Sequence, residues 1–469
     1  MPIPKEILEV ERPTNTVVIA YGKDKNRYGV RQRIGCRNDG GRHLPINGPT
    51  IGHIVNGQYV PIKPTEPVSI SESGVDLKEW ANVVFCDAKF VEIQNELLKV
   101  YNRHDMLTIY CIAVLRVCVP GIKDYELKEA YENSFLSELY PDIALSKNTV
   151  CKFLNQLGKT CSRITAFMQN RAAAVNLEHH LLIDGTLKSD ELKINTLSDF
   201  SRKAKTKETE DISVLFAFDL EEMEPVCSKC FPGNMLDLTA YESFIQENNI
   251  TTGIIVADKG FPASAAQNAF RNNPDLHYLN PIKRNAVLVE KHDLLDFTGI
   301  LSGFEGITYR KEKCSQSKWL YSFRDALKAA KTVVLESDLD MTPETAYKAY
   351  NKRWEMEIVV RFYKSACEFD ETRVHDDYSV IGSEFCDFLS TLLTFRLLKT
   401  FDNVKLLEHM TYKVIMSALK RAKKVKVPGS DWQLIRINPS IVDILQKLGI
   451  LEAPVSTPRK RGRPKKLPI

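Results

Sequence analysis

The sequence has no apolar run long enough to cross a membrane. Its longest apolar stretches, Met106 to Leu115 and Phe385 to Phe395, fall well short of the roughly 20 residues that a spanning helix needs. The first residues also lack the charged and then apolar layout of a signal peptide. We therefore expect a cytoplasmic protein without a membrane partner.

Several chemical motifs are missing as well. The chain contains no Gly-rich loop that could cradle phosphates, no nucleophile elbow and no zincin helix. Its 11 cysteines are an odd number scattered along the sequence, which indicates reduced thiols rather than a disulfide framework. Cys227 and Cys230 form the only close pair, whereas a structural zinc site needs four ligands. Zinc binding is therefore a minor alternative.

Excess positive charge is scarce outside the C-terminal tail. The net charge is +4, and six basic residues of the tail exceed it, so the rest of the chain is slightly acidic. Concentrated basicity favours a local contact with a polyanion. The six are Arg459, Lys460, Arg461, Arg463, Lys465 and Lys466.

The same tail resembles an AT-hook, with Arg461, Gly462, Arg463 and Pro464 as its core. An extended Arg-Gly-Arg segment can enter the narrow minor groove of A·T-rich DNA, where the negative potential is enhanced. A basic tail that only solubilises or targets the protein is the alternative. We expect no ordered structure from Pro454 onward.

One predicted helix gathers four functional groups on one face. Thr342 can cap it, and neither Pro nor Gly interrupts it between Pro343 and Gly382. At about 100° per residue, the four side chains fall within an arc of roughly 60°. A solvated face with an Arg–Glu pair is the alternative. The four are Tyr350, Arg353, Glu357 and Lys364.

Two upstream segments each end a short apolar run with an aspartate. Asp184 follows the run from His179 and precedes Gly185, and Asp258 follows the run from Thr251. Buried strands deliver carboxylates to the edge of an α/β sheet in this way. A single such aspartate is usually a turn residue or a helix cap. Two of them, followed by a helix that carries Glu357, favour a shared site.

Carboxylates from two strands and one helix suit hard divalent cations. Mg²⁺ takes oxygen ligands and commonly binds a few carboxylates together with substrate phosphates. Two such ions roughly 4 Å apart can support phosphodiester chemistry. The predicted cofactor is therefore a pair of Mg²⁺ ions, for which Mn²⁺ could substitute. The Arg and Lys beside Glu357 would hold phosphates.

These residues carry a family resemblance. The chain resembles a DDE transposase of a bacterial insertion sequence, in the group with a Tyr-x2-Arg-x3-Glu-x6-Lys signature. Tyr350, Arg353, Glu357 and Lys364 match that spacing, and Asp184 and Asp258 with their neighbours match the family's two acidic motifs. Phe231, Pro232, Gly233 and Asn234 resemble a further common segment. The resemblance covers approximately residues 76–400.

The resemblance implies an α/β fold with a ribonuclease H-like mixed-sheet core that a β-rich insertion interrupts. It implies that Asp184, Asp258 and Glu357 are the metal ligands and catalytic residues. Tyr350, Arg353 and Lys364 would bind the transposon end. Water would attack each element end, and the freed 3′-hydroxyl would then join target DNA, in a homodimer assembled on the terminal inverted repeats. The protein would then be associated with the nucleoid.

The sequence predicts seven consecutive regions. The N-terminal region is β-rich, the next is helical and could bind DNA, and the C-terminal region is helical before the disordered tail. In order, they are residues 1–66 (β-rich), 76–177 (helical), 178–285 (first part of the core), 286–340 (β-rich insertion), 341–400 (second part of the core), 401–453 (helical) and 454–469 (AT-hook-like tail). Helices are expected at 77–101, 405–424 and 439–448, and strands at 213–218, 307–310, 319–323 and 332–335. Asp219 ends the strand at 213–218 without a glycine close behind it, so it ranks below Asp184 and Asp258.

Two of these regions carry further candidate DNA contacts. Ser146 can cap a helix that resembles the second helix of a helix-turn-helix, with Lys147, Asn148 and Lys152 left to meet DNA. Near the N-terminus, Arg27, Arg31, Arg33 and Arg37 make a basic segment between predicted strands at 16–20 and 55–62. A solvated helical hairpin and a solvated loop are the respective alternatives.

Two other functions fit the same residues. A metal-dependent DNA nuclease without strand transfer would use the same three acids. A non-catalytic protein that binds A·T-rich DNA and descends from a transposase would need only the basic segments. The presence of all three acids favours an enzyme.

Overall fold

The computed structural model describes residues 3–21, 27–39, 42–62, 74–190, 196–200, 210–235, 237–257, 267–283, 286–326, 331–353, 371–372 and 376–452. It divides into two compact units. The first contains Met1–Asp76 and Val427–Ser430, and the second contains Leu77–Lys426 and Asp431–Ile469. Within the described part of the chain, no helix is both long and apolar enough to span a membrane.

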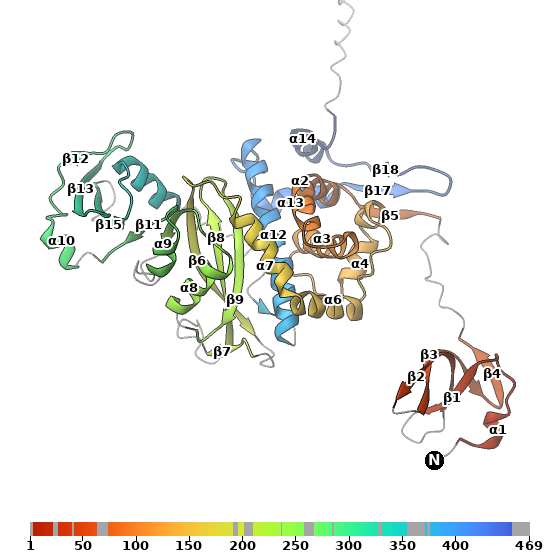
Figure 1. The fold of residues 1–469 in the computed structure, drawn as a ribbon. Helices are drawn as coiled ribbons and strands as arrows, with labels where there is room; N and C mark the ends of the chain where they lie inside the picture. The colour runs from red at the N-terminus through yellow and green to blue at the C-terminus, as the bar shows by residue number, and fades with distance from the viewer. Residues whose placement is uncertain are drawn as a thin grey trace, which may run out of the picture. The chain divides into compact units, whose positions relative to one another are not determined.

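The first unit is a four-stranded antiparallel sheet in the order β1-β2-β3-β4, preceded by helix α1 (Figure 1). Val18, Val30 and Ile54 form its small core. The expected β-rich character of this region is confirmed. The elements are α1 (Lys5–Leu8), β1 (Thr16–Tyr21), β2 (Arg27–Asp39), β3 (Arg42–Val55) and β4 (Gln58–Pro61).

Two details of this sheet differ from the prediction. The segment 55–62 is not one strand, because Asn56 and Gly57 adopt positive φ angles of 50° and 75° and form the tight turn between β3 and β4. The basic segment that begins at Arg27 is not a connecting loop but strand β2. Its Gly and Arg content hides the strand, since pairing with β3 rather than intrinsic propensity holds it extended.

The second unit begins with helices, as expected for residues 76–177. One boundary is wrong, because the helix predicted from Leu77 begins at Ala81, and the preceding residues form strand β5 (Asp76–Glu79). β5 lies in a small sheet with β17 (Lys423–Lys426) and β18 (Gln433–Leu434). The helices are α2 (Ala81–Leu98), α3 (Arg103–Cys118), α4 (Leu127–Glu132), α5 (Leu136–Leu139), α6 (Lys147–Lys159) and α7 (Cys161–Ala172).

The large sheet contains the strand order of a ribonuclease H-like core. Five of its strands lie in the order β9-β8-β6-β10-β11, in which the first three are antiparallel and β6, β10 and β11 are parallel. Helix α8 (Asp237–Glu247) precedes β10, and α9 (Gln267–Asn272) follows it. The strands are β6 (His180–Asp190), β8 (Glu210–Asp219), β9 (Glu224–Pro232), β10 (Gly253–Ala257) and β11 (Leu276–Pro281). The predicted α/β fold class is therefore confirmed.

The segment that follows β11 is β-rich and extends this sheet. Strand β15 pairs antiparallel with β11, and β14, β13 and β12 continue outward, which gives 11 strands with the two short strands β7 (Asp199–Phe200) and β16 (Glu371–Thr372). The three strands expected between residues 307 and 335 are present. The added elements are α10 (Val287–Lys291), β12 (Gly299–Ile300), β13 (Ile307–Ser315), β14 (Lys318–Asp325) and β15 (Lys331–Ser337).

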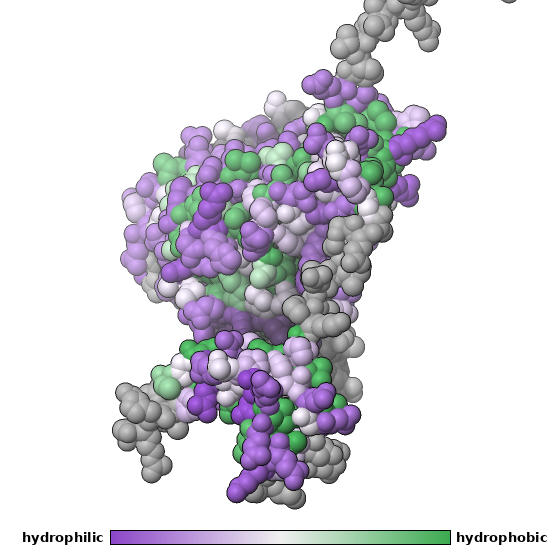
Figure 2. All heavy atoms as spheres, turned by 90° about the vertical axis from the view of Figure 1, so that its right-hand side faces the viewer, coloured by the Kyte–Doolittle hydropathy of each residue, from purple (hydrophilic) through white to green (hydrophobic). Residues whose placement is uncertain are grey.

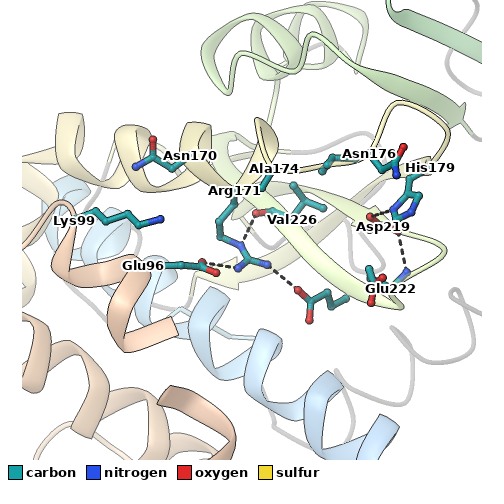
Figure 3. Close-up of a pocket in the computed structure, with 12 residues that line it drawn as sticks. Glu96, Lys99, Asn170, Arg171, Ala174, Asn176, His179, Asp219, Glu222 and Val226 are labelled. Carbon is teal, nitrogen blue, oxygen red and sulfur yellow. Dashed lines mark hydrogen bonds and ion pairs between the residues drawn. The ribbon is translucent and has the colours of Figure 1, made fainter. Parts of the chain in front are cut away.

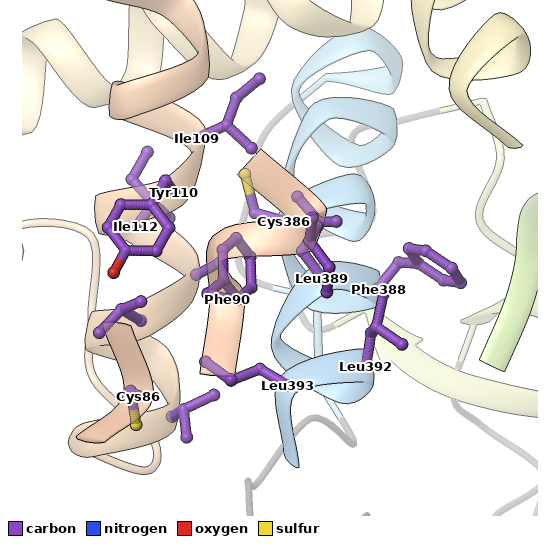
Figure 4. Packing of buried hydrophobic residues seen from close by; sticks show 14 of the residues in the cluster. Cys86, Phe90, Ile109, Tyr110, Ile112, Cys386, Phe388, Leu389, Leu392 and Leu393 are labelled. Atoms are coloured by element: carbon purple, nitrogen blue, oxygen red, sulfur yellow. The ribbon is translucent and has the colours of Figure 1, made fainter. Parts of the chain in front are cut away.

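Helix α12 (Asp377–Asn403) lies between the sheet and the helices α2 and α3 (Figure 1). Apolar side chains of α12 interleave with those of α2 and α3 (Figure 4). Its contact with α6 is very close, because a Cβ added at Gly158 would lie 1.9 Å from the Tyr378 carbonyl oxygen, and one added at Gly382 would lie 2.1 Å from that of Leu154. Glycine at both positions allows the two backbones to meet.

Two short helices follow α12. The single helix expected from Lys405 to Lys424 is wrong, because only α13 (Tyr412–Arg421) forms there and the next residues enter strand β17. The last expected helix is present as α14 (Pro439–Lys447), with the Asn438 side chain accepting a hydrogen bond from the Ser440 N–H at 3.2 Å.

The face of the molecule shown in Figure 2 mixes hydrophilic and hydrophobic residues.

Candidate active site

Asp184 lies in the middle of strand β6, not at its end as the sequence predicted. β6 continues to Asp190, because β8 pairs with it along this whole length. On the other side of β6, strand β10 is described as far as Ala257, which pairs with Ile183. Asp184 is therefore the first residue of β6 beyond the described end of β10. Its carboxylate is half-buried and accepts a hydrogen bond from the Gly185 N–H at 2.9 Å.

The helix that carries Tyr350 and Arg353, described over residues 343–353, is called the signature helix. It packs on the face of the sheet that carries Asp184. Side chains alternate along a strand, so Leu182, Asp184 and Lys188 lie on one side of β6. Leu182 belongs to a buried cluster with Val256 of β10 and with residues of the helix at 343–353. Those helix residues are Ala346, Tyr347, Ala349 and Tyr350. Two strands and this helix therefore converge on one side of the sheet.

The helix begins as the sequence predicted. The Thr342 hydroxyl accepts a hydrogen bond from the Thr345 N–H at 3.2 Å, and Pro343 is the first helical residue. Tyr350 and Arg353 are each only 5% exposed, and the Arg353 guanidinium carbon lies 5.1 Å from the centre of the Tyr350 ring. Both side chains stabilise the packing of the helix in this structure, and a DNA contact of either one stays a prediction.

The other predicted site residues lie outside the described residues. Asp258 directly follows the described part of β10, and Glu357 and Lys364 follow the described part of the signature helix. The four AT-hook residues Arg461, Gly462, Arg463 and Pro464 also lie outside it. Of the three predicted metal ligands, the structure describes Asp184.

An ion group that the sequence did not predict ties the signature helix to the start of β6. Lys352 donates a hydrogen bond to Glu221 Oε1 at 3.1 Å, and Glu221 Oε2 accepts one from the His180 N–H at 2.7 Å. Burial acts to raise the pKa of Glu221, but the hydrogen bonds from His180 and Lys352 outweigh it and lower the pKa to about 2. Glu221 therefore stays ionised and anchors the helix one residue before Arg353.

A His–Asp pair lies beside this group. His179 Nδ1 is 2.7 Å from Asp219 Oδ2, and ligand atoms of His179, Asp219 and Glu221 all lie within 4.8 Å of one another. The cationic Lys352 already contacts Glu221, and Asp219 accepts hydrogen bonds from the N–H groups of Glu221 and Glu222 at 2.9 Å. Asp219, which the sequence ranked below the other acids, therefore acts as a turn residue.

A cavity of about 270 Å³ opens next to His179 and Asp219 (Figure 3). Its wall includes Arg171, whose side chain is almost fully buried and bonds to Glu96, to Glu224 and to the Val226 carbonyl oxygen. These contacts join α2 and α7 to β9. The Arg171 guanidinium thus binds α2 and α7 to the edge of the sheet at β9.

A second buried ion group lies toward the other end of β6. Lys188 is bound by Glu384 at 2.5 Å and by Asp387 at 3.1 Å, and Asp387 also binds Arg116 of α3 at 2.8 Å. Burial opposes the charge of Lys188, but the two carboxylates outweigh it and raise the pKa of Lys188. Burial raises the pKa of Glu384 despite Lys188. An acid inside an apolar helix, as at Asp387, is the sequence signal that could have revealed this group.

Two further motifs acquire a structural explanation. Cys227 and Cys230 lie on strand β9, and burial raises the pKa of both thiols. A raised thiol pKa opposes the deprotonation that metal binding requires. At the end of β9, a Cβ on Gly233 would lie 2.0 Å from the Asp211 carbonyl oxygen, and Asn234 donates a hydrogen bond to Asp199. The segment from Phe231 to Asn234 therefore joins three stretches of chain.

The predicted recognition helix is α6. Its N-terminus is capped by Ser146, whose hydroxyl accepts a hydrogen bond from the Thr149 N–H at 3.4 Å. Val150 and Leu154 are buried, whereas Lys147, Asn148 and Lys152 are exposed, as expected. DNA contact by this exposed face stays a prediction.

The fold and the position of Asp184 define an α/β domain of ribonuclease H-like topology with a carboxylate on its central strand. Residues 175–380 match the family model described as "Transposase DDE domain". This part of the chain is therefore similar to the DDE domain of transposases. The match contains β6, β10 and the signature helix, which converge on the face of the sheet that carries Asp184.

The chain also resembles two solved transposase structures at low sequence identity. A piggyBac transposase synaptic complex with hairpin DNA has 14% sequence identity and a TM-score of 0.41, and the alignment covers 73% of this chain and 80% of that one. A Mos1 transposase paired-end complex with a left transposon end has 11% identity and a TM-score of 0.16, with coverage of 34% and 58%. No curated protein matches the chain.

Proposed function

We propose that this chain is a transposase that cleaves the ends of its mobile DNA element and joins them to target DNA. The observation that carries the proposal is the convergence of β6, β10 and the signature helix on the face of the sheet that carries Asp184. The family match over residues 175–380 supports the same assignment.

In this proposal, Asp184, Asp258 and Glu357 hold two Mg²⁺ ions. Asp258 follows Ala257, whose partner in the sheet is the residue before Asp184, and Glu357 follows the described helix by four residues. Carboxylate oxygens fit Mg²⁺ or Mn²⁺, and the half-buried Asp184 can offer its oxygens to an ion. When bound, the ions supply charge stabilisation for phosphodiester cleavage.

The protein's own residues orient the DNA. Lys364 contacts the cleaved strand, and Tyr350 and Arg353 hold the helix and the adjacent phosphates in position. Water first attacks the phosphodiester at each element end, and the released 3′-hydroxyl then attacks target DNA. A homodimer holds both ends together, because each terminal inverted repeat needs its own active site. The tail from Arg461 to Pro464 adds minor-groove contacts.

Purified protein and a linear DNA that carries the two ends of the element test this function. In Mg²⁺ we expect cleavage at both ends and joined products with a target plasmid. Asp184→Asn should abolish both products, because it removes one of the oxygen donors that hold the ions. Asp443→Asn, a change of the same kind on the exposed side of α14, should leave both unchanged.

Three results would contradict the proposal. Cleaved ends without any joined product would identify a nuclease that lacks strand transfer. Equal cleavage by the Asp184→Asn protein would show that Asp184 does not hold the metal ions, and absence of cleavage by the unchanged protein would leave only a DNA-binding role.

A further inference from the structure

Strands β2 and β3 extend well beyond the sheet of the first unit. β1 pairs with β2 only as far as Gln32, and β4 pairs with β3 only from Gly52 onward. The backbone of Arg33 still bonds to Asn15, just ahead of β1. From there to the turn, β2 and β3 pair with each other and with no other described strand. Residues 33–47 therefore form a two-stranded ribbon with about seven residues in each strand, which gives it a reach of roughly 20 Å.

Where its side chains are described, at residues 33–36 and 45–47, the ribbon has no buried face. These residues are all exposed, and they include apolar ones: Ile34 is 64% exposed and Ile46 is 41% exposed. A two-stranded ribbon gains little stability by itself, so a core contribution does not explain its length. Both isoleucine side chains are therefore accessible to another molecule.

The charge on this arm has one sign. Residues 27–50 contain five arginines, one aspartate and neither lysine nor glutamate. The side chains of Arg27, Arg31 and Arg33 are exposed, and no carboxylate in the described part of the chain pairs with them. Arg31 Nε donates a hydrogen bond to the Thr50 hydroxyl across the two strands at 3.3 Å. Arg37 and Arg42 belong to the same two strands near the turn.

The pairing within the arm is irregular in a way that redirects its side chains. Register shifts lie between Val30 and Arg31, between Arg31 and Arg33, and between Arg33 and Gly35. Bulges increase the local twist of a ribbon and change the direction of the residues that flank them. Both arginines with described side chains in this stretch therefore lie beside a bulge.

We propose that this ribbon inserts into the major groove of duplex DNA. The major groove is about 12 Å wide and admits a two-stranded β-ribbon. Arginine can bind guanine edges or phosphates bidentately, and exposed isoleucines can contact thymine methyl groups. The ribbon thus supplies a DNA contact that is separate from Asp184, from α6 and from the C-terminal tail. It is independent of whether the protein cleaves DNA.

Affinity for a mixed-sequence 30-base-pair duplex tests the arginines. The measurement uses the full chain in EDTA, so that no cleavage occurs, and netropsin to occupy the A·T-rich minor groove that the tail would enter. We expect Arg33→Gln and Arg37→Gln each to weaken binding roughly tenfold and to reduce the slope of log affinity against log salt by about 0.9. Lys5→Gln, which removes one charge from α1 of the same unit, is the control and should change neither.

Cys36 gives a direct test of the groove, since it is an exposed native cysteine within the ribbon. Duplexes that carry a disulfide-activated thiol tether on cytosine N4 or on guanine N2 report the major and the minor groove, respectively. We expect disulfide cross-linking to the cytosine tether and its loss in Cys36→Ser. The thiolate of Cys36 displaces the activating thiol, so no external oxidant is needed.

Three results would overturn this proposal. The first is unchanged affinity and salt slope in both arginine variants. The second is cross-linking of Cys36 to the minor-groove tether as readily as to the major-groove tether. The third is equal binding of a double-stranded RNA of the same sequence, because the deep and narrow major groove of RNA does not admit side chains. None of these results depends on Asp184, so the failure of one proposal does not imply the failure of the other.

Discussion

Strand β6 carries ionisable residues in two different settings. At Lys188 the charge is buried and held by Glu384 and Asp387 of another element. At Asp184, four residues earlier on the same face, the residue is half-buried, and its carboxylate accepts a hydrogen bond from the adjacent Gly185 N–H. The first setting buries a charge in an ion group, whereas the second keeps a carboxylate at a partly exposed position of the sheet. The difference separates residues that stabilise this fold from those that we propose act on DNA.

The largest expected effect concerns Asp184, and it should appear in activity rather than in stability. Asp184→Asn should reduce DNA cleavage at least about a thousandfold, since several kcal/mol of charge stabilisation are lost with the ions. The free energy of unfolding in metal-free buffer should stay equal to that of the unchanged protein or rise slightly. A large fall in stability, measured by urea denaturation, would mean that Asp184 is a structural residue like Lys188.

Lys188→Met should show the opposite behaviour. Removing the ammonium leaves Glu384 and Asp387 buried with one cation fewer, which should lower the free energy of unfolding by about 3–5 kcal/mol. Combining it with Glu384→Gln should recover part of that loss, because the uncompensated buried charge is then gone. Urea denaturation measures both effects.

The exposed ion pair of Lys128 and Glu132 supplies the control for this change. Lys128→Met should cost only a few tenths of a kcal/mol, because exposed pairs contribute little. A similar small cost for Lys188→Met would contradict the structural role of the buried group.

The smallest effect is expected at Glu221 and depends on pH. The pKa of Glu221 is lowered from its ordinary value of 4.5 to about 2, so its ionisation stabilises the folded state above pH 4.5, and this contribution is lost as the pH falls toward 2. Glu221→Gln should therefore lower the free energy of unfolding by about 1 kcal/mol at neutral pH. The difference from the unchanged protein should vanish near pH 2.

Glu129→Gln, at an exposed position of α4, serves as the control for pH and should follow the unchanged protein throughout. A deficit of Glu221→Gln that does not depend on pH would contradict the proposed ion group and would leave only a packing effect.

The sequence predicted the elements whose residues carry their own signal. Apolar runs identified β8, β10 and the strands from β13 to β15, and the caps at Ser146 and Thr342 identified the starts of two helices. The ribonuclease H-like core followed from the family resemblance. In each of these cases the local preference and the final structure agree.

The elements that the sequence missed depend on partners far away in the chain. β5 and β9 contain polar or charged residues that hide a strand, and their extended form comes from pairing with β17 and β8. The true end of β6 has the same cause, since pairing with β8 carries the strand past Asp184. Glu221 and Lys352 are 131 positions apart, and no local pattern links them. The sequence therefore predicted which residues would form the candidate site. The ion groups around it could be found only from the folded structure.

Manganese binding tests the central claim most directly. Titration of Mn²⁺, followed by the electron paramagnetic resonance of the free ion, compares the unchanged protein, Asp184→Asn and Asp443→Asn. We predict that Asp184→Asn weakens Mn²⁺ binding at least about tenfold, since even residues outside the ligand shell can cost that much, while Asp443→Asn binds as the unchanged protein does. Equal Mn²⁺ affinity in all three proteins would contradict the assignment of Asp184 as a metal ligand.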